Sequence, residues 1–382
     1  MILVTDGQMR QTLAVIRSLG KKGIKVMVGD SERISMGFFS KYTYKHIIYP
    51  DPVENEKAFV EFILNTVKTE EIEMIIPIRD KCLIPLSKYK KEFEKYTKIP
   101  IPDYGLVMKA RDKGKTLRIA EKIGIPTPKT YYPNSIDDLV KITEYPVIIK
   151  PRMSSGSRGC VFCSNFQELR DNFDKVSKEY PEGLLIQEYI PKQKEIGYYA
   201  LFNTHSELRA LTIQKRLRSY PTEGGPSTLR ETIQYDQIRE LGTKLLKFMK
   251  WQGVAMVEFR IDNRDSVPKL MEVNPRFWGS LALSIAAGVD FPYLLYQLAL
   301  NGDIEENLDY KIGIKCRWLL PGDILWFLSA KKNFTNLKSF LKFTGTKYDI
   351  FDWRDLGPLI GIVLTSIIYL FNKDKRKYVF RR

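Results

Sequence analysis

The chain has 382 residues, of which 44% are hydrophobic and 28% are charged, and this composition excludes a disordered protein. The length predicts two or three domains. The 61 basic and 45 acidic residues give a net charge of +16, which favours an anionic partner such as a nucleotide, a nucleic acid or an anionic membrane surface.

Four cysteines do not make a disulfide framework, and two histidines argue against catalysis by a histidine base. We expect a reducing, cytoplasmic setting, because the chain begins directly with strand-like residues and shows no cleavable signal.

Residues 1–98 alternate short apolar runs with helical patterns. The predicted strands are Ile2–Thr5, Ile24–Val28 and Met74–Pro77, and the predicted helices are Gln8–Leu19, Asn55–Thr69 and Leu83–Tyr96. This βαβ order predicts a parallel, Rossmann-like sheet with helices on both faces. No G-x-G-x-x-G motif follows the first strand, so a dinucleotide site is not supported. Asp6-Gly7 and Arg79-Asp80 follow strand ends, where such sheets bind ligands, and they are equally compatible with plain loops.

The next segment combines a helix, a strand and a glycine-rich loop. The pattern predicts a helix over Lys109–Ile123 that carries Lys113, and a strand over Tyr145–Pro151 whose last polar residue is Lys150. A loop of small residues follows, formed by Ser154, Ser155, Gly156, Ser157, Arg158 and Gly159. Small residues let backbone N–H groups approach and cradle phosphate oxygens, although such a loop alone is usually an ordinary turn.

Further along, three more features follow in order. A predicted strand over 184–190 ends with Gln187, Glu188, Tyr189 and Ile190. Glu195 comes next and, taken alone, would be interpreted as a surface charge. A strand over Arg209–Lys215 leads to a second glycine loop at 222–227.

An acidic patch near residue 270 is the strongest chemical signal. The segments around Glu258 and Glu272 both alternate apolar and polar residues, as strands with one buried face do. The alternation places Glu272 and Asn274 on one face, and Glu258 is able to lie beside them on a neighbouring strand. Carboxylate and amide oxygens suit Mg²⁺, and Arg276 close behind can fork onto a phosphate. Either segment alone would be interpreted as glutamates on the solvated face of a hairpin, but the upstream motifs favour a metal site.

The order of these parts resembles the ATP-grasp superfamily, and within it most closely the carbamoyl-phosphate-synthase-like group. The resemblance implies an α/β protein in three parts. A Rossmann-like βαβ domain spans 1–98, and a two-lobed α+β ATP-grasp domain spans 99–305, with its small lobe at about 113–187. A short, helical and partly hydrophobic extension spans 306–382.

The resemblance also implies how a nucleotide is held. ATP would be bound together with one or two Mg²⁺ ions, with Mn²⁺ as a substitute. Lys113 and Lys150 would contact the phosphates, and the loop 154–159 would close over the β- and γ-phosphates. The segment 187–190 would form the adenine hinge, and Glu195 would hold the ribose hydroxyls.

The remaining residues carry the implied chemistry. Glu258, Glu272 and Asn274 would hold the metal, and Arg276, helped by Lys215, would stabilise the phosphorylated intermediate. Members of the superfamily phosphorylate a carboxylate to an acyl phosphate, which an amine or a thiol then attacks, releasing ADP and phosphate. Phosphoryl transfer needs positioning and charge neutralisation more than a base, so the scarcity of histidine is compatible with this reaction.

One departure narrows the expected reaction. The full carbamoyl phosphate synthase has two such modules and a glutaminase partner, whereas this chain has one module and no glutaminase-like segment. A single-module carboxylate–amine ligase, joining amino acids or small peptides in cell-wall or cofactor biosynthesis, therefore fits better. The alternatives are a non-catalytic ATP-binding regulatory module, or a carbamoyl-phosphate-synthase-like enzyme that phosphorylates a small carboxylate. Nucleic acid is not expected, because the basic residues are dispersed and show no recognition pattern.

The last part of the chain is apolar and then basic. Residues 356–371 form a largely uncharged run, and residues 372–382 hold six basic residues and one acidic residue. A spanning helix needs about 17 to 25 apolar residues, so the run falls short. Three interpretations stay open: a packed helix, a dimerisation element of a homodimer, or a helix on the anionic inner face of the membrane.

Overall fold

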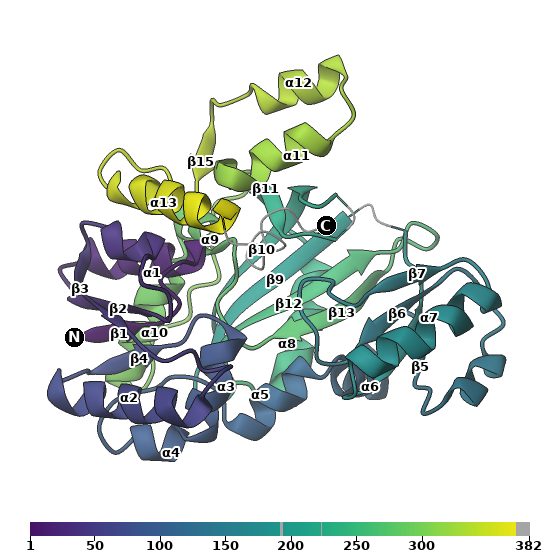
Figure 1. Ribbon diagram of the computed structural model, residues 1–382, viewed down its shortest axis with the longest axis horizontal. Coiled ribbons are helices and arrows are strands. Elements are labelled where there is room, and N and C mark those ends of the chain that lie inside the picture. The colour runs from purple at the N-terminus through teal and green to yellow at the C-terminus, as the bar shows by residue number, and fades with distance from the viewer. Residues whose placement is uncertain (192–193, 223, 372–382) are drawn as a thin grey trace.

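The computed structural model describes residues 1–191, 194–222 and 224–371, which form three sheets with surrounding helices (Figure 1). The first sheet has the order β3-β2-β1-β4 and is parallel throughout. Its strands are β1 (Ile2–Val4), β2 (Val26–Asp30), β3 (Thr43–Ile48) and β4 (Met74–Ile76). The strand β3 was not predicted from the sequence, because its side chains are largely exposed and give no apolar run.

Helices cover both faces of this first sheet. Along β1, Ile2 and Val4 enter one hydrophobic core and Leu3 enters another, which requires apolar cover on each side. The helices of this region are α1 (Arg10–Gly20), η1 (Met36–Phe39), α2 (Glu56–Thr69), α3 (Asp80–Lys88) and α4 (Lys90–Phe93). The single helix expected over Leu83–Tyr96 was wrong, because the chain turns at Tyr89 between α3 and α4.

A small sheet and its helices follow. The helices α5 (Tyr104–Arg111) and α6 (Lys113–Lys122) replace the one helix expected over Lys109–Ile123. The break is Asp112, whose side chain accepts hydrogen bonds from the N–H groups of Gly114 (2.9 Å) and Lys115 (3.2 Å) and so begins a new helix. The sheet has the order β5-β8-β6-β7. Its elements are β5 (Thr130–Tyr131), η2 (Ile136–Lys141), β6 (Val147–Pro151), β7 (Val161–Cys163), α7 (Phe166–Glu179) and β8 (Leu184–Glu188).

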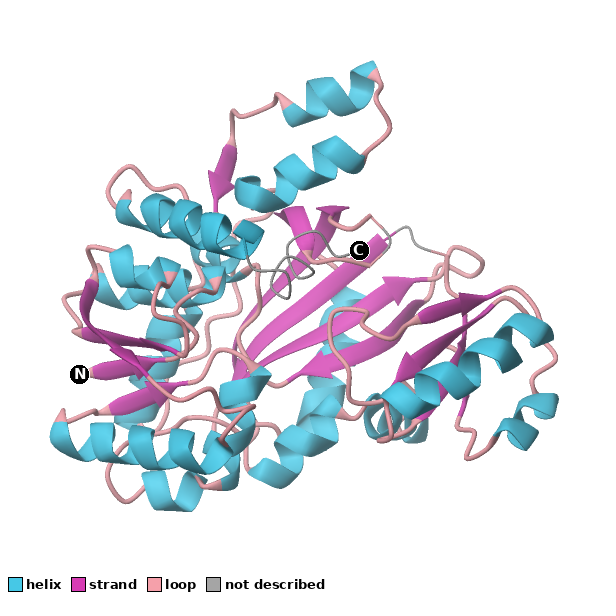
Figure 2. Cartoon of the chain, in the orientation of Figure 1, coloured by secondary structure: helices cyan, strands magenta, loops and turns pink. Residues whose placement is uncertain are grey.

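The large central sheet has the order β13-β12-β9-β10-β11-β14-β15 (Figure 2). It is built from β9 (Lys194–Phe202), β10 (Leu208–Ser219), β11 (Ser227–Thr232), β12 (Gly253–Ile261), β13 (Pro268–Asn274), β14 (Lys315–Arg317) and β15 (Thr346–Tyr348). One face packs with α8 (Asp236–Phe248) into a core that includes Tyr198, Ile213 and Val257. The alternate residues of the same strands therefore lie on the opposite face, where the polar side chains gather.

The C-terminal part packs on the first domain and adds strands β14 and β15 to the large sheet. The helices α9 (Leu281–Ala286) and α10 (Phe291–Asn301) are followed by η3 (Leu319–Asp323), α11 (Ile324–Ser329), α12 (Phe334–Phe340) and α13 (Gly357–Phe371). α13 packs on η1, and a Cβ atom at Gly357 would lie 1.9 Å from the carbonyl oxygen of Phe39. The glycines of α13 thus allow close packing on the first domain. The domain boundaries expected from the sequence remain a prediction.

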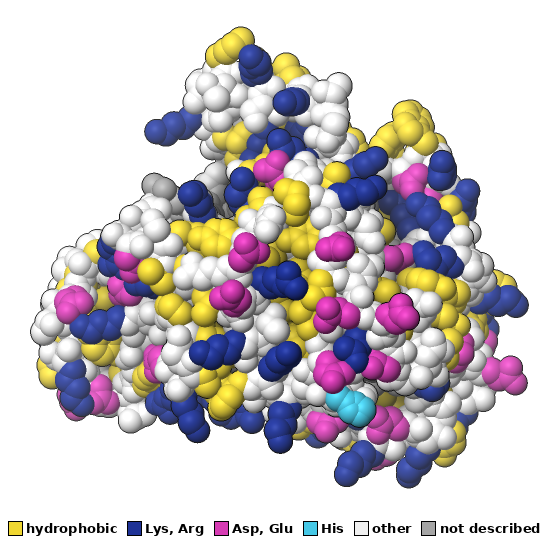
Figure 3. Space-filling view, turned by 180° about the vertical axis from the view of Figure 1, so that it is seen from behind, with side chains coloured by type: hydrophobic (Ala, Val, Ile, Leu, Met, Phe, Trp, Pro, Cys, Tyr) yellow, Lys and Arg dark blue, Asp and Glu magenta, His cyan; other side chains and the backbone are white. Residues whose placement is uncertain are grey.

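Charge is spread over the molecule. Figure 3 shows Lys and Arg side chains scattered among acidic ones on the face seen from behind. No helix among the described residues is long and apolar enough to cross a membrane. The basic tail at 372–382 and the loop residue Glu223 lie outside the described residues.

Candidate functional site

Two carboxylates face each other on neighbouring strands of the large sheet. Glu258 on β12 lies directly opposite Glu272 on β13. Asn274 follows two residues later on the same face, and its Nδ2 donates a hydrogen bond to Oε1 of Glu272 at 3.0 Å. Strand alternation thus brings the three predicted metal ligands together. The described residues contain no group of three or more His, Cys, Asp or Glu side chains that could hold a metal ion, so the predicted donor set consists of two carboxylates and one amide.

The two carboxylates have different electrostatic surroundings. Burial raises the pKa of Glu258 to about 7, and the neighbouring Glu272 and Glu195 add to the rise against the lowering effect of Arg216. Burial also acts to raise the pKa of Glu272, but Lys113, Asn274 and Arg276 together hold it below its usual value. Two buried carboxylates that lie opposite each other on neighbouring strands suit a divalent cation, because a cation between them would offset their mutual repulsion.

Two arginines that were not predicted from the sequence surround Glu195. Arg216 contacts both Glu258 and Glu195, with its Nη1 3.2 Å from Oε2 of Glu195. Arg260 donates to Oε1 of Glu195 at 2.6 Å and to the carbonyl oxygen of Ile190 at 3.1 Å. For Arg260 the signal was present, because it stands two residues from Glu258 on the same strand. In this structure Glu195 is thus an ion-pair partner, and its contact with a ribose remains a prediction.

Lys215 does not join this group. Its nearest carboxylate is Glu231, 3.4 Å away on β11. Its register partner on β9 is Ile196, which belongs to the core on the α8 side of the sheet. Neighbouring residues of a strand point to opposite faces, so Arg216 reaches the carboxylates and Lys215 does not. The expectation that Lys215 helps Arg276 to stabilise the phosphorylated intermediate is therefore corrected.

The two predicted phosphate lysines approach the carboxylates from the small-lobe side. Nζ of Lys113 lies 3.4 Å from Oε2 of Glu272 and donates to the carbonyl oxygen of Ser154. Nζ of Lys150 donates to Oε1 of Gln187 at 2.5 Å. The pKa of Lys150 is lowered to about 8, chiefly by burial and also by Arg260 and Lys113, while Cys160 and Glu272 act to raise it. Lys113 therefore lies beside Glu272, and Lys150 is held by Gln187 in the segment predicted to form the hinge.

The first glycine loop touches the second. Oγ of Ser157 donates a hydrogen bond to the carbonyl oxygen of Gly224 at 2.9 Å. Gly156, Ser157 and Gly159 all have positive φ angles, of 65°, 61° and 70°. These angles show that the loop is a tight turn, and turns can present successive N–H groups to an anion. The predicted phosphate loop and the second glycine loop therefore lie against one another.

The predicted hinge segment follows β8. The Gln187 side chain is fixed between Lys150 and the hydroxyl of Thr130, to which its Nε2 donates at 2.9 Å. Glu188 accepts hydrogen bonds from Lys269 at 3.0 Å and Arg264 at 2.7 Å, so its side chain is engaged in an ion-pair cluster. The expected contact of an adenine with backbone groups of Glu188, Tyr189 and Ile190 remains a prediction.

Arg276 connects the large sheet to the first domain. Its Nε lies 2.9 Å from Oδ1 of Asp80, and its Nη2 donates to Oδ1 of Asn274 at 3.3 Å. Asp80 also pairs with Arg111 at 3.4 Å. Burial acts to raise the pKa of Asp80, but the two arginines hold it below its usual value. The strand-end carboxylate Asp80 thus holds the arginine in place.

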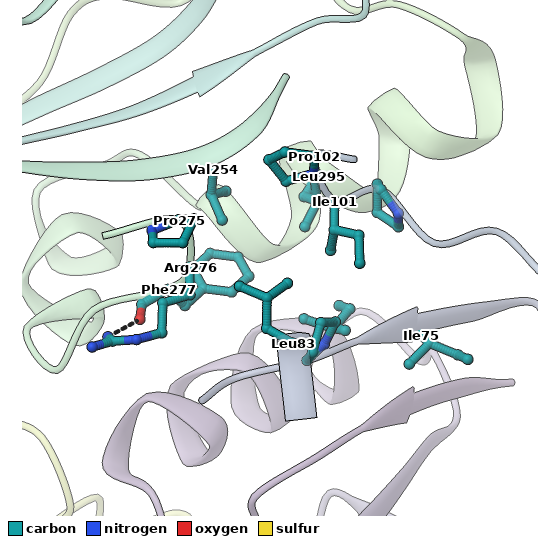
Figure 4. A pocket seen from close by; sticks show the side chains of 12 residues that line it. Ile75, Leu83, Ile101, Pro102, Val254, Pro275, Arg276, Phe277 and Leu295 are labelled. Atoms are coloured by element: carbon teal, nitrogen blue, oxygen red, sulfur yellow. Dashed lines mark hydrogen bonds between the residues drawn. The ribbon is translucent and has the colours of Figure 1, made fainter. Parts of the chain in front are cut away.

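Behind Arg276 lies a pocket between the first domain and the large sheet (Figure 4). Its lining is apolar apart from Arg276 and comprises Ile75, Ile76, Pro77, Leu83, Pro100, Ile101, Pro102, Val254, Pro275, Phe277 and Leu295. Figure 4 shows the guanidinium of Arg276 turned away from these apolar side chains, where it donates to the carbonyl oxygen of Phe277 at 3.1 Å. The pocket therefore belongs to the domain junction, and the charged end of Arg276 faces the site.

Comparison with known proteins places the chain in a family. The model of the carbamoyl-phosphate synthase L chain, ATP binding domain, matches residues 112–307. The carbamoyl phosphate synthase large chain of Clostridium acetobutylicum is 25% identical over 215 residues, which are 53% of this chain and 20% of that protein. The chain thus spans about a fifth of the length of this curated relative. It belongs to the carbamoyl-phosphate synthase L chain ATP-binding family, within the ATP-grasp superfamily.

Solved structures share the fold at low sequence identity. The biotin carboxylase domain of 2-oxoglutarate carboxylase from Hydrogenobacter thermophilus, solved with MgADP and bicarbonate, matches with a TM-score of 0.69 at 17% identity, covering 82% of this chain and 73% of that chain. An L-amino acid ligase from Bacillus licheniformis matches at 0.64 and 19%, covering 80% and 75%. N5-carboxyaminoimidazole synthetase from Staphylococcus aureus matches at 0.64 and 19%, covering 82% and 80%. The mixed α/β ATP-grasp fold is therefore confirmed.

Proposed function

We propose that the protein is an ATP-dependent carboxylate–amine (or carboxylate–thiol) ligase that forms an acyl phosphate and releases ADP and phosphate. The observation that carries this proposal is the convergence of Lys113, Glu258, Glu272, Asn274 and Arg276 on one face of the large sheet. Family membership supports ATP as the nucleotide. The biotin carboxylase domain from Hydrogenobacter thermophilus was solved in complex with MgADP, which supports magnesium as the metal.

In this proposal the lysines and the loops hold the triphosphate. Lys150 and Lys113 would neutralise phosphate oxygens, and the loop at 154–159 would cover them with its N–H groups. Water must be kept from an acyl phosphate, and the contact between Ser157 and Gly224 supports a joint cover formed by both loops. Glu258, Glu272 and Asn274 would hold Mg²⁺, which when bound supplies charge neutralisation at the transferring phosphoryl group.

The bond changes balance without a base on the protein. A carboxylate oxygen of the substrate forms a bond to the γ-phosphorus, the bond from that phosphorus to the β-bridging oxygen breaks, and ADP leaves. The amine nitrogen then attacks the acyl carbon, the bond from that carbon to the phosphate oxygen breaks, and the leaving inorganic phosphate takes up the proton that the nitrogen loses. Arg276, held by Asp80, would stabilise the charge on the acyl phosphate.

The substrates are expected to be small. A ligase that joins amino acids or short peptides in cell-wall or cofactor biosynthesis fits a single module, and one structural neighbour is an L-amino acid ligase. The biotin carboxylase neighbour is a domain dimer, which supports a homodimer as a further expectation for light scattering to test. A non-catalytic ATP-binding module is the second candidate.

Hydroxylamine tests the proposed intermediate. The full chain is incubated with MgATP, pooled amino acids and small carboxylates, and hydroxylamine as the attacking amine. We expect hydroxamate and ADP in equal amounts, because hydroxylamine captures an acyl phosphate. Hydroxamate formed together with AMP would show that the intermediate is an acyl adenylate and not an acyl phosphate. Tight ATP binding without any product would favour the non-catalytic module.

A further inference from the structure

α13 has one packed face and one bare apolar face. Its Gly361, Ile362 and Thr365 are buried, on the side turned to η1 and the first domain. The other face carries a stripe of large apolar side chains that are 36% to 84% exposed: Ile360, Val363, Leu364, Ile367, Ile368 and Phe371. A surface helix ordinarily turns polar residues outward, and α13 contains no charged residue at all. Contact with water alone therefore does not explain why this face of α13 is apolar.

A second apolar element lies close by in the sequence. α11 and α12 form a hairpin that projects from the top of the molecule (Figure 1). None of the residues of α12 is buried. Phe334 is 78% exposed, Leu328 64% and Leu341 57%. The hairpin therefore presents these three side chains outward, while Trp326 lies beside Arg218 and Phe340 beside Arg317 on the body of the protein.

The charged residues of the hairpin all have the same sign. Between Asp323 and Asp349 the chain has five lysines, Lys331, Lys332, Lys338, Lys342 and Lys347, and no acidic residue. Figure 3 shows basic and hydrophobic side chains side by side on the projecting part at the top. The segment after α13, residues 372–382, adds six basic residues against one acidic residue. Trp353, 78% exposed, stands between the hairpin and α13 in the sequence.

We infer that the bare face of α13 and the α11–α12 hairpin together dock the protein on an anionic lipid bilayer. Apolar side chains beside lysines, with an exposed tryptophan, match the boundary between acyl chains and anionic headgroups. The docking is peripheral, because no described helix is long enough to span. A second copy of the chain is disfavoured as the occupant, because a symmetric contact would place the same lysines against each other. The inference is independent of the ligase chemistry.

Vesicle sedimentation tests the docking with the full chain. Vesicles of phosphatidylcholine alone are compared with vesicles that contain phosphatidylcholine and phosphatidylglycerol. Two variants probe the two contributions, V363E/I367E for the apolar face and K338E/K342E for the charge. Val140→Glu is the matched control, since Val140 is 67% exposed but lies on η2 in the small lobe. Circular dichroism and thermal melting establish that each variant is folded.

The expected result is binding of the wild-type chain and of Val140→Glu to the anionic vesicles. Both paired variants should bind about tenfold more weakly or worse, since each removes apolar insertion or charge attraction. High salt should weaken the binding of the wild-type chain to anionic vesicles until it approaches the binding to neutral vesicles. Equal sedimentation of all four proteins, or none with any vesicle, would overturn the inference. A concentration-dependent dimer that V363E/I367E abolishes, without vesicle binding, would assign the face to a second copy instead.

Discussion

Glu258 and Glu272 lie directly opposite each other on β12 and β13, yet each has its own cationic partner. Arg216 pairs with Glu258, and Lys113 lies 3.4 Å from Glu272. The pair therefore joins two regions of the fold, because Arg216 comes from the large sheet and Lys113 from the first turn of α6. A bound nucleotide and metal would meet both carboxylates at this junction.

Removing the charge of Glu272 should abolish turnover and leave the fold intact. Glu272→Gln keeps the shape and the hydrogen bond with Asn274 but weakens metal binding, so ADP formation should fall by about a hundredfold or more. ADP release and thermal melting are measured on the same preparations. Glu231→Gln is the matched control, since Glu231 is an ion-paired glutamate that faces Lys215 away from the site. Turnover near the wild-type level in Glu272→Gln would contradict the assignment of Glu272 as a metal ligand.

The dependence of kcat/KM on pH should be bell-shaped. Glu258, with a pKa raised to about 7, must lose its proton to hold a cation, so activity should rise through that pH. Lys150, with a pKa lowered to about 8, must keep its proton to bind a phosphate, so activity should fall above it. Lys150→Arg keeps its charge at every pH in this range and should lose the alkaline fall. An unchanged alkaline limb in that variant would mean that another group sets it.

Two glycines of the phosphate loop should respond differently to alanine. Both have positive φ angles, but a Cβ atom at Gly156 meets nothing within 4 Å, whereas one at Gly159 would lie 2.4 Å from the Tyr180 ring. Gly156→Ala should carry only the backbone cost of about 1–2 kcal/mol. Gly159→Ala should cost more and should raise the KM for ATP more, because the ring and the loop must also shift. Steady-state kinetics and melting temperatures measure both effects, and equal values would show that the ring yields freely.

Asp349 should be important for stability. It is buried between Arg230 and Arg10, and it joins the C-terminal extension to β11 and α1. Asp349→Asn leaves two guanidinium groups without their counter-charge, so the free energy of unfolding should fall by about 3–5 kcal/mol. Asp352→Asn, in the half-exposed pair with Lys21, should cost less than about 1 kcal/mol. Denaturant titration compares the two variants, and similar losses would contradict the assigned role of Asp349.

Much of the fold was predictable because its signals are local. The apolar runs of β1, β2 and β4 and the alternation of β12 and β13 follow directly from the residue pattern. β3 was missed because its exposed residues show no such pattern, and the break at Asp112 was missed because a capping aspartate inside a helical stretch is a weak signal.

The site was predictable to the extent that it depends on strand alternation. Glu258, Glu272 and Asn274 meet as expected because residues two apart share a face. Arg216 was missed and Lys215 chosen instead, because the face of β10 depends on its pairing with β9 and cannot be read from β10 alone. The pairing of Asp80 with Arg276 joins residues 196 positions apart, and no local pattern indicates it.

The central claim is tested most directly by the nucleotide product. The full chain is incubated with Mg²⁺ and ATP against pooled amino acids, short peptides and small carboxylates, and ADP, AMP, phosphate and pyrophosphate are separated. The account predicts ADP and phosphate that require Mg²⁺, depend on a particular pool, and disappear in Glu272→Gln. AMP and pyrophosphate, or ADP release that Glu272→Gln retains, would contradict it.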